Sequence, residues 1–201
     1  MSSRPLLLAS ASPRRREILR TLGIEFEAVS VDADESERAG ETPSDYLIRV
    51  VAAKLAHALP VAQSGGHPGV IVADTTVVLG DVMLAKPLDE ADNRRMVRAL
   101  AGRDHHVMTR FAVHAIGGET VAETVVTGVT VRALDDDEIA RYVASGEGRD
   151  KAGGYAIQGL GAFAVIGIRG SYANVVGLPA CEVVTACKRL GLLGPYPHAP
   201  S

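Results

Sequence analysis

The sequence has no excess of basic residues, few cysteines and no long hydrophobic run. It carries 21 Lys and Arg against 24 Asp and Glu, a net charge of −3, so its charge does not suggest a nucleic-acid polymer as partner. Cys181 and Cys187 lie six residues apart, which matches neither a zinc-ligand spacing nor a CxxC redox pair. No apolar run reaches the ~18 residues of a membrane helix, and Leu6–Ala9 is too short for the core of a signal peptide. We therefore expect a cytoplasmic protein with no membrane partner.

Two widespread phosphate-binding sequences are also missing, namely the Walker A loop and the GxGxxG turn. Their absence disfavours the two modes of phosphate binding that depend on them. The composition is otherwise that of a globular protein, with 47% hydrophobic and 22% charged residues among 201. We expect a single domain over residues 1–201, in which 194–201 form a loose tail rich in proline and small residues.

The order of apolar runs and helix signals predicts an α/β fold, with a mixed twisted sheet flanked by helices. Strands and helices do not alternate regularly, so a purely parallel sheet is disfavoured. The predicted strands are Leu6–Ala9, Phe26–Val31, Val70–Ala73, Val77–Leu79, Val82–Leu84, His106–Ile116, Thr120–Arg132 and Phe163–Ile168. The predicted helices begin near Ser12, Thr42, Asp89, Asp135 and Pro179, and end near Leu22, Leu59, Gly102, Gly146 and Leu190.

The first candidate for chemistry is the segment Ser10-Ala11-Ser12-Pro13-Arg14-Arg15, which joins a strand to a helix. A helix start presents unpaired N–H groups and partial positive charge, and both suit an anion. The two hydroxyls and two guanidiniums add donors that fit phosphate oxygens. The alternative is a capped helix with solvated arginines, and the strand–loop–helix context favours phosphate binding.

Four further charged residues are candidates for a metal and phosphate site. Asp74 ends an apolar strand, where a carboxylate suits a metal ligand or a base, although a turn aspartate is the alternative. Pro87 restricts the backbone before it and so directs Lys86. Lys54 lies mid-helix among apolar residues and points either toward an anion or out to solvent. Glu35 lies in an acidic loop, where an ordinary surface role is the alternative.

The last candidate is a glycine-rich segment around Gln158, with glycines at 153, 154, 159 and 161. Glycine lets the backbone approach a ligand closely. The Gln158 amide offers a donor and an acceptor side by side, which complement the N–H and carbonyl edge of uracil or thymine. A glycine-rich turn with a structural glutamine is the alternative. Cations for a polyphosphate, carboxylates for a metal and an amide for a base make up the inventory of a nucleotide hydrolase.

These residues resemble those of the Maf family, nucleotide pyrophosphatases with a fold related to inosine triphosphate pyrophosphatases. The resemblance spans nearly the whole chain. Small departures are Arg110 and Ala156, each in place of an expected glycine. The matching blocks are Leu8–Arg15, Glu41-Thr42-Pro43 with Tyr46 and Lys54, Ala73-Asp74-Thr75, Lys86-Pro87, Gly102-Arg103, His106–Thr109, Asp150–Gly159 and Asn174–Pro179.

The resemblance implies a central ligand cleft and hydrolysis of a nucleoside triphosphate to a monophosphate and pyrophosphate. It further implies the branch that acts on dTTP and UTP, through Arg14, Thr75 and Gln158. It implies that Asp74 and Glu35 bind a divalent metal ion, Mg²⁺ or Mn²⁺. A homodimer is expected by analogy with the family only. Asp74 is then the general base or solely a metal ligand, while Lys54 and Lys86 take part in catalysis. The groups expected to bind phosphate oxygens are Ser10, Ser12, Arg14, Arg15, Lys54 and Lys86.

Other functions stay open at this point. The substrate could be 7-methyl-GTP or a modified pyrimidine triphosphate. The chain could also be a nucleotide-binding regulator of septum formation without turnover, or a phosphatase that releases the γ-phosphate. The intact Asp74, Lys54 and Lys86 argue against a pure regulator, which has no need of a base. Nucleotide specificity and the nature of the released product separate these functions.

Overall fold

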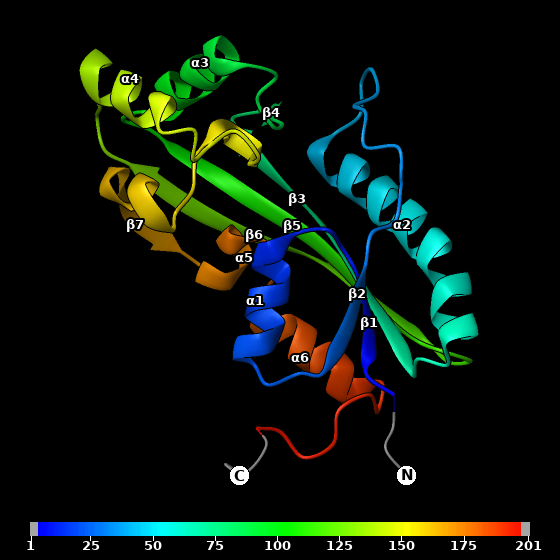
Figure 1. Ribbon diagram of the computed structural model, residues 1–201. Coiled ribbons are helices and arrows are strands. Elements are labelled where there is room, and N and C mark those ends of the chain that lie inside the picture. Colours follow the sequence, from blue (N-terminus) through cyan, green and yellow to red (C-terminus); the bar gives the residue numbers. More distant parts are fainter. Residues whose placement is uncertain (1–3, 198–201) are drawn as a thin grey trace. The chain divides into compact units, whose positions relative to one another are not determined.

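A computed structural model describes residues 4–197 of the chain (Figure 1). Its contacts divide the chain into two compact units. The first unit takes the described residues up to Asp74, Arg110–Thr124 and the segment from Gly177 onward, and the second takes Thr75–Thr109 and Val125–Val176. A single domain over 1–201 stays a prediction, and residues 198–201 of the predicted tail lie outside the described residues.

The described strands form one mixed sheet, as the sequence predicts. In chain order they are β1 (Leu6–Ala9), β2 (Phe26–Val29), β3 (Gly69–Leu79), β4 (Val82–Leu84), β5 (Asp104–Ala115), β6 (Thr120–Val131) and β7 (Val165–Arg169). The strand order is β2-β1-β3-β5-β6-β7, and β4 pairs with β3 off this path. β1 runs parallel to β2 and β3, whereas the pairs β3–β4 and β6–β7 are antiparallel. The mixed, helix-flanked sheet is therefore confirmed.

The helices begin where the sequence places caps. They are α1 (Pro13–Thr21), α2 (Pro43–Gly65), α3 (Glu90–Leu100), α4 (Asp136–Ala144), α5 (Tyr172–Val176) and α6 (Ala180–Arg189), with short 3-10 helices η1 (Ala152–Gly154) and η2 (Gly159–Ala164). Ser12 and Thr42 accept from the backbone N–H groups of residues 15 and 45. Asp135 forms a complete capping box with Glu138. These side chains satisfy N–H groups that a helix start leaves unpaired.

The core of the first unit lies between α2 and the parallel strands. Buried residues of α2 recur every three or four positions, which places them on one helical face. Alternate residues of β3, including Val70 and Val72, share a face of the sheet because side chains alternate along a strand. These positions form one buried cluster with Val51, Ala58 and Ala62 of α2. The next residue on that face of β3 is Asp74, so its carboxylate faces the same side as the α2 cluster.

The second unit has its own apolar core. Val77, Leu84, Met96, Leu100 and other buried residues form one cluster, and α3 packs against α4 around Val97 and Ile139. α3 and α4 lie side by side in Figure 1. Each unit therefore has a cluster of buried apolar side chains of its own.

Several predicted boundaries differ from the structure. α2 continues to Gly65, through Pro60, whereas the sequence predicts its end near Leu59 and a loop from Gln63. β3 is one strand where two were predicted, and β7 begins at Val165 because η2 occupies the preceding residues. The sequence analysis missed α5.

None of the helices within residues 4–197 is both long and apolar enough to cross a membrane, and this includes α2 with its 23 residues.

Candidate active site

The start of α1 forms a polar site around Ser10. The Ser10 hydroxyl accepts from the Ser12 backbone N–H at 3.2 Å and from Arg15 Nη1 at 3.2 Å. Arg15 Nε donates to the Gly177 carbonyl at 2.8 Å. Arg15 is only 9% exposed, so the alternative of a solvated arginine is wrong for this residue, while Arg14 is half-buried. The hydroxyls and Arg15 thus converge at the helix start, as predicted.

Burial and nearby carboxylates act on the charge of Arg15 in opposite directions. Burial lowers the pKa of its guanidinium from the ordinary value, because a charged group loses hydration there. The carboxylates of Asp74 and Glu35 act in the opposite direction and raise that pKa. The helix start therefore lies within the electrostatic field of the two acidic side chains that the sequence proposes as metal ligands.

Lys54 joins those two carboxylates. Its Nζ donates to Asp74 Oδ1 at 2.7 Å and lies 2.6 Å from Glu35 Oε1. The side chains of Lys54 and Asp74 are 9% and 11% exposed, and that of Glu35 is 44% exposed. Lys54 occupies the buried stripe of α2 and Asp74 the facing side of β3, so the alternative of a solvent-directed lysine is wrong. The predicted grouping of Lys54, Asp74 and Glu35 is present in the first unit.

The acidic loop that carries Glu35 is tied to α2 by residues outside the predicted site. Tyr46 Oη donates to the Glu35 carbonyl at 3.2 Å. Arg49 binds the Glu41 carboxylate and two loop carbonyls. Burial raises the pKa of Tyr46 and the negative charges of Asp74 and Glu35 raise it further, so the phenol stays protonated and able to donate. The i, i+3 spacing of Tyr46 and Arg49 places both side chains on one face of α2, but the sequence does not show that this face meets the loop.

The two carboxylates suit a divalent cation. One carboxylate oxygen of Asp74 and one of Glu35 point toward the same position, which the Lys54 ammonium occupies. Mg²⁺ takes oxygen ligands, commonly one or two protein carboxylates, and keeps several waters. Within residues 4–197, no group of three or more His, Cys, Asp or Glu side chains could hold a metal ion. The donors therefore fit a hydrated Mg²⁺ or Mn²⁺, and they do not fit an ion enclosed by protein ligands alone.

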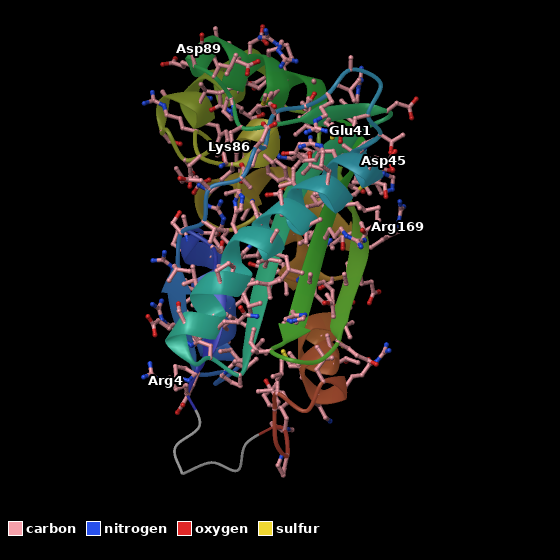
Figure 2. The ribbon with its side chains drawn as sticks, turned by 90° about the vertical axis from the view of Figure 1, so that its right-hand side faces the viewer. Arg4, Glu41, Asp45, Lys86, Asp89 and Arg169 are labelled. Atoms are coloured by element: carbon pink, nitrogen blue, oxygen red, sulfur yellow. The ribbon has the colours of Figure 1, made fainter. Side chains whose placement is uncertain are left out.

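The remaining predicted site residues belong to the second unit. The Thr75 hydroxyl lies 2.9 Å from that of Thr109, which donates to the Asn174 carbonyl at 3.2 Å. Lys86 is exposed just after β4 and is labelled in Figure 2. Gln158 is exposed at the start of η2. A common site for these three residues and Asp74 stays a prediction.

Side chains of α4 and of the residues after it form hydrogen bonds to the backbone of the segment that carries Gln158. The Glu147 carboxylate accepts from the backbone N–H groups of Leu160 and Gly161 at 2.7 and 2.8 Å. Tyr142 Oη accepts from the Ala156 N–H at 3.0 Å. The sequence analysis did not predict either contact, because no local pattern marks a carboxylate that binds a loop thirteen residues away. Gln158 thus projects from a segment whose backbone is bound on both sides.

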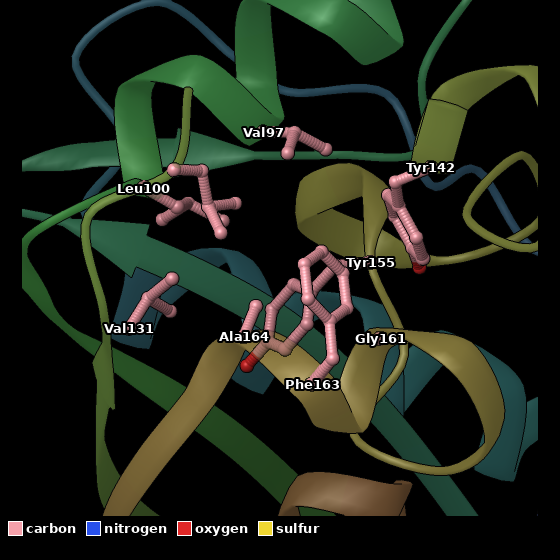
Figure 3. Close-up of a pocket in the computed structure, with 9 residues that line it drawn as sticks. Val97, Leu100, Val131, Tyr142, Tyr155, Gly161, Phe163 and Ala164 are labelled. Carbon is pink, nitrogen blue, oxygen red and sulfur yellow. The ribbon is translucent and has the colours of Figure 1, made fainter. Parts of the chain in front are cut away.

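An apolar hollow in the second unit does not qualify as a nucleotide site. The cavity volume is about 20 Å³, whereas ligand pockets usually measure ~300–1,000 Å³. Figure 3 shows that side chains of Tyr142, Tyr155 and Phe163 surround it together with aliphatic residues. A hollow this small and apolar is a packing feature of the core.

Comparison with known proteins finds one matching family model and several relatives that are similar over most of the chain. A family model described as "Maf-like protein" matches residues 5–190. The chain is 48% identical to a dTTP/UTP pyrophosphatase of Geotalea uraniireducens over 94% of this chain and 96% of the relative. It is 45% identical to one of Shewanella oneidensis (94% and 99%) and 47% identical to one of Myxococcus xanthus (95% and 95%). A solved dITP/XTP pyrophosphatase from Mycobacterium abscessus aligns over 63% of this chain and 72% of its own at 17% identity, with a TM-score of 0.39, too low to bear on function.

Proposed function

Because the chain belongs to the Maf family, we propose that it is a nucleoside triphosphate pyrophosphatase that hydrolyses dTTP and UTP to the monophosphate and pyrophosphate. Relatives at 43–48% identity over most of the chain carry the name dTTP/UTP pyrophosphatase. The matching sequence covers both units, so it includes every residue that the sequence analysis proposes for the site.

The observation that carries this proposal is the contact of Lys54 with both Asp74 and Glu35. A buried ammonium held by two carboxylates combines, in one place, a cation for phosphate oxygens and acidic groups for a metal ion. Arg15 lies in the field of the same carboxylates. Phosphoryl-group hydrolysis depends mainly on such placed charges, because little covalent chemistry falls to the protein.

The residues of the first unit then have distinct tasks. Arg14 and Arg15, with the hydroxyls of Ser10 and Ser12, bind phosphate oxygens at the start of α1. Asp74 takes a proton from the water that attacks the α phosphorus, and Lys54 neutralises charge on the pyrophosphate as it leaves. A Mg²⁺ or Mn²⁺ ion on Asp74 and Glu35 would supply further charge neutralisation of the polyphosphate.

Base recognition in this proposal falls mainly to residues of the second unit. Gln158 reads the uracil or thymine edge with its amide, together with Thr75 and Arg14. Lys86 binds phosphate oxygens. Substituting Gln158 by Ala tests the first role, because loss of the amide removes the preference for uracil and thymine over cytosine, while an unchanged preference contradicts it.

A nucleotide panel with product analysis tests the proposed function. The purified chain is incubated with dTTP, UTP, dCTP, dATP, dGTP, 7-methyl-GTP and modified pyrimidine triphosphates, each with Mg²⁺ or Mn²⁺. We expect pyrophosphate and monophosphate, with dTTP and UTP as the preferred substrates. Orthophosphate as the product would instead show a γ-phosphatase, and binding without turnover would show a regulator.

We also propose a cytoplasmic homodimer, by analogy with the family. The structure describes a single chain, so this proposal is tested in solution. Light scattering during size-exclusion chromatography is expected to give twice the mass of 21.0 kDa, and cell fractionation is expected to recover the chain with cytoplasmic proteins. A mass of one chain at every concentration would contradict the dimer.

A further inference from the structure

Arg49 of α2 contacts the loop between β2 and α2 at several points. Arg49 Nε and Nη2 lie 2.6 and 2.8 Å from the two carboxylate oxygens of Glu41, which gives a bidentate pair. Arg49 Nη1 also donates to the Asp34 carbonyl at 3.0 Å, and Nη2 to the Ser36 carbonyl at 2.8 Å. One guanidinium thus closes the loop onto the helix through four contacts. Figure 2 labels Glu41 beside Asp45 near the start of α2.

The Glu35 carbonyl, which lies between the carbonyls of Asp34 and Ser36 in the chain, is also bound by a side chain of α2. Tyr46 Oη donates to the Glu35 carbonyl at 3.2 Å, and the Arg49 guanidinium lies 5.5 Å from the centre of the Tyr46 ring. Three consecutive carbonyls, at residues 34, 35 and 36, are therefore held by two side chains one helical turn apart. Fixing three successive peptide groups leaves the Glu35 side chain few directions in which to project.

The ion pair of Arg49 and Glu41 is partly buried and close, so it can hold the loop against α2. The two side chains are 19% and 10% exposed, whereas the neighbouring pair of Arg38 with Asp34 is 61% and 63% exposed and 3.9 Å long. Bidentate, partly buried pairs are stronger and more directional than exposed ones. A lysine at position 49 keeps the charge but cannot reproduce the planar set of donors.

We propose that Arg49, clasped by Glu41, is a positioning residue that fixes the Glu35 loop so that the Glu35 carboxylate reaches Lys54 and a divalent cation. Arg49 acts through the backbone of residues 34–36, whose carbonyls at Asp34 and Ser36 it contacts directly. The inference rests on the proposed function for the cation, while the loop geometry stands independently of it.

The test compares Arg49→Lys, Arg49→Met and Glu41→Gln with the unaltered chain. The first measurement is hydrogen–deuterium exchange over residues 32–42, where we expect faster exchange in all three variants. The second is Mn²⁺ binding without nucleotide, followed by electron paramagnetic resonance, where the dissociation constant is expected to rise about tenfold or more, as for other groups that orient metal ligands. In turnover assays, the Mn²⁺ concentration required for half-maximal rate rises to the same extent.

Arg38→Met is the matched control, because it removes an arginine from the same loop but only a long, exposed ion pair. It should leave exchange and Mn²⁺ affinity close to those of the unaltered chain. Arg49→Lys separates positioning from charge: normal exchange and normal Mn²⁺ affinity in this variant would overturn the proposal. Glu41→Gln keeps the test decisive if Arg49→Met fails to fold.

The same data separate this inference from the proposed function. If the unaltered chain neither binds Mn²⁺ nor releases pyrophosphate, the proposed function fails, and loop exchange alone then decides whether Arg49 positions the loop. If the unaltered chain is active and the Arg49 variants retain its Mn²⁺ affinity and loop exchange, the positioning role fails and the proposed function stands.

Discussion

At the residue scale, Asp74 occupies the end of an apolar run and faces α2 from β3. Substituting Asp74 by Asn removes the carboxylate charge but keeps the size of the side chain. We expect turnover of dTTP to fall at least ~100-fold, the usual effect of losing a general base, while circular dichroism stays unchanged. Steady-state kinetics and thermal unfolding measure the two effects. Near-normal turnover would rule out a catalytic role for Asp74.

Lys54 has a structural effect that can be separated from its chemistry. Lys54→Met leaves Asp74 buried beside Glu35 without its cation, and breaking one side of a buried pair typically costs about 3 kcal/mol or more. We expect urea unfolding to show a loss of this order. Adding Asp74→Asn to the same chain removes the unpaired charge and should recover most of the stability but none of the activity. Equal stability of the single and double variants would contradict this account.

His105 makes the free energy of unfolding depend on pH. It is buried, its Nε2 lies 2.8 Å from Tyr155 Oη, and its Nδ1 has no hydrogen-bond partner among the described residues. Burial, with a smaller contribution from His106, lowers the pKa of His105 to about 4. The unfolded chain, with a pKa near 6.5, therefore takes up a proton that the folded chain excludes. Stability is complete above about pH 6.5 and falls as the pH drops toward 4, by about 3 kcal/mol for this group.

His105→Phe tests that dependence. The substitution changes the absolute stability, so the relevant quantity is the slope between pH 7 and pH 4 in urea unfolding. We expect a flatter slope than in the unaltered chain, because the titrating group is gone. The exposed neighbour is the control, and His106→Gln should leave most of the slope in place. An unchanged slope in His105→Phe would assign acid sensitivity to other groups.

At the element scale, the first turn of η2 and the segment around it depend on Glu147. Its carboxylate accepts two backbone N–H groups, and a Cβ at Gly159, where φ is +74°, would come within 2.1 Å of Glu147 Oε1. Glu147→Ala is expected to raise amide exchange at residues 160 and 161 at least about tenfold, since hydrogen bonds to charged groups contribute ~1.5–3 kcal/mol. Glu147→Gln, which keeps one acceptor oxygen, should show a smaller increase. Asp137→Asn, on an exposed pair of α4, is the control.

The loosened loop should also affect base preference. Gln158 lies in this segment, so we expect Glu147→Ala to reduce the preference for dTTP over dCTP more than it reduces turnover of dTTP. Competition assays with both nucleotides measure that ratio. A proportional loss of activity on both substrates would indicate a general structural effect instead.

Local patterns predicted the starts of five helices and the ends of four of them to within two residues, whereas the end of α2 was predicted six residues too early. Ser12, Thr42 and Asp135 are caps in the structure because capping depends on only three or four neighbouring residues. The end of α2 was wrong because Pro60 suggests a stop. The structure shows that Ala58 and Ala62 continue the buried stripe across it, and that Gly66, with φ of +68°, ends the helix instead. Tertiary packing, which the local pattern does not contain, decided that boundary.

At the scale of the whole molecule, the predicted site residues divide at one peptide bond. Asp74 is the last residue of a segment in the first unit, and Thr75 begins the second. The sequence places Lys54 among the apolar residues of a helix and Asp74 at the end of an apolar run, but it left open whether Lys54 points toward an anion or out to solvent. The contact of Arg49 with Glu41, and that of Glu147 with its loop, could not be predicted. They bring together side chains and peptide groups whose distances depend on the packed fold.

Removal of divalent cations is expected to separate the activity of the molecule from its stability. Lys54 lies between Asp74 and Glu35 and offsets their repulsion, so the folded chain does not need a metal ion for this purpose. A bound ion adds only about 0.4 kcal/mol when its concentration equals its dissociation constant, which shifts the thermal midpoint by roughly 1–2 °C for a chain of this size. EDTA should therefore abolish pyrophosphate release with almost no change in the midpoint. In Lys54→Met the same chelation should lower the midpoint further, since the metal ion then replaces the charge that Lys54 otherwise supplies between the two carboxylates. Equal shifts in both proteins would show that Lys54 does not take this role.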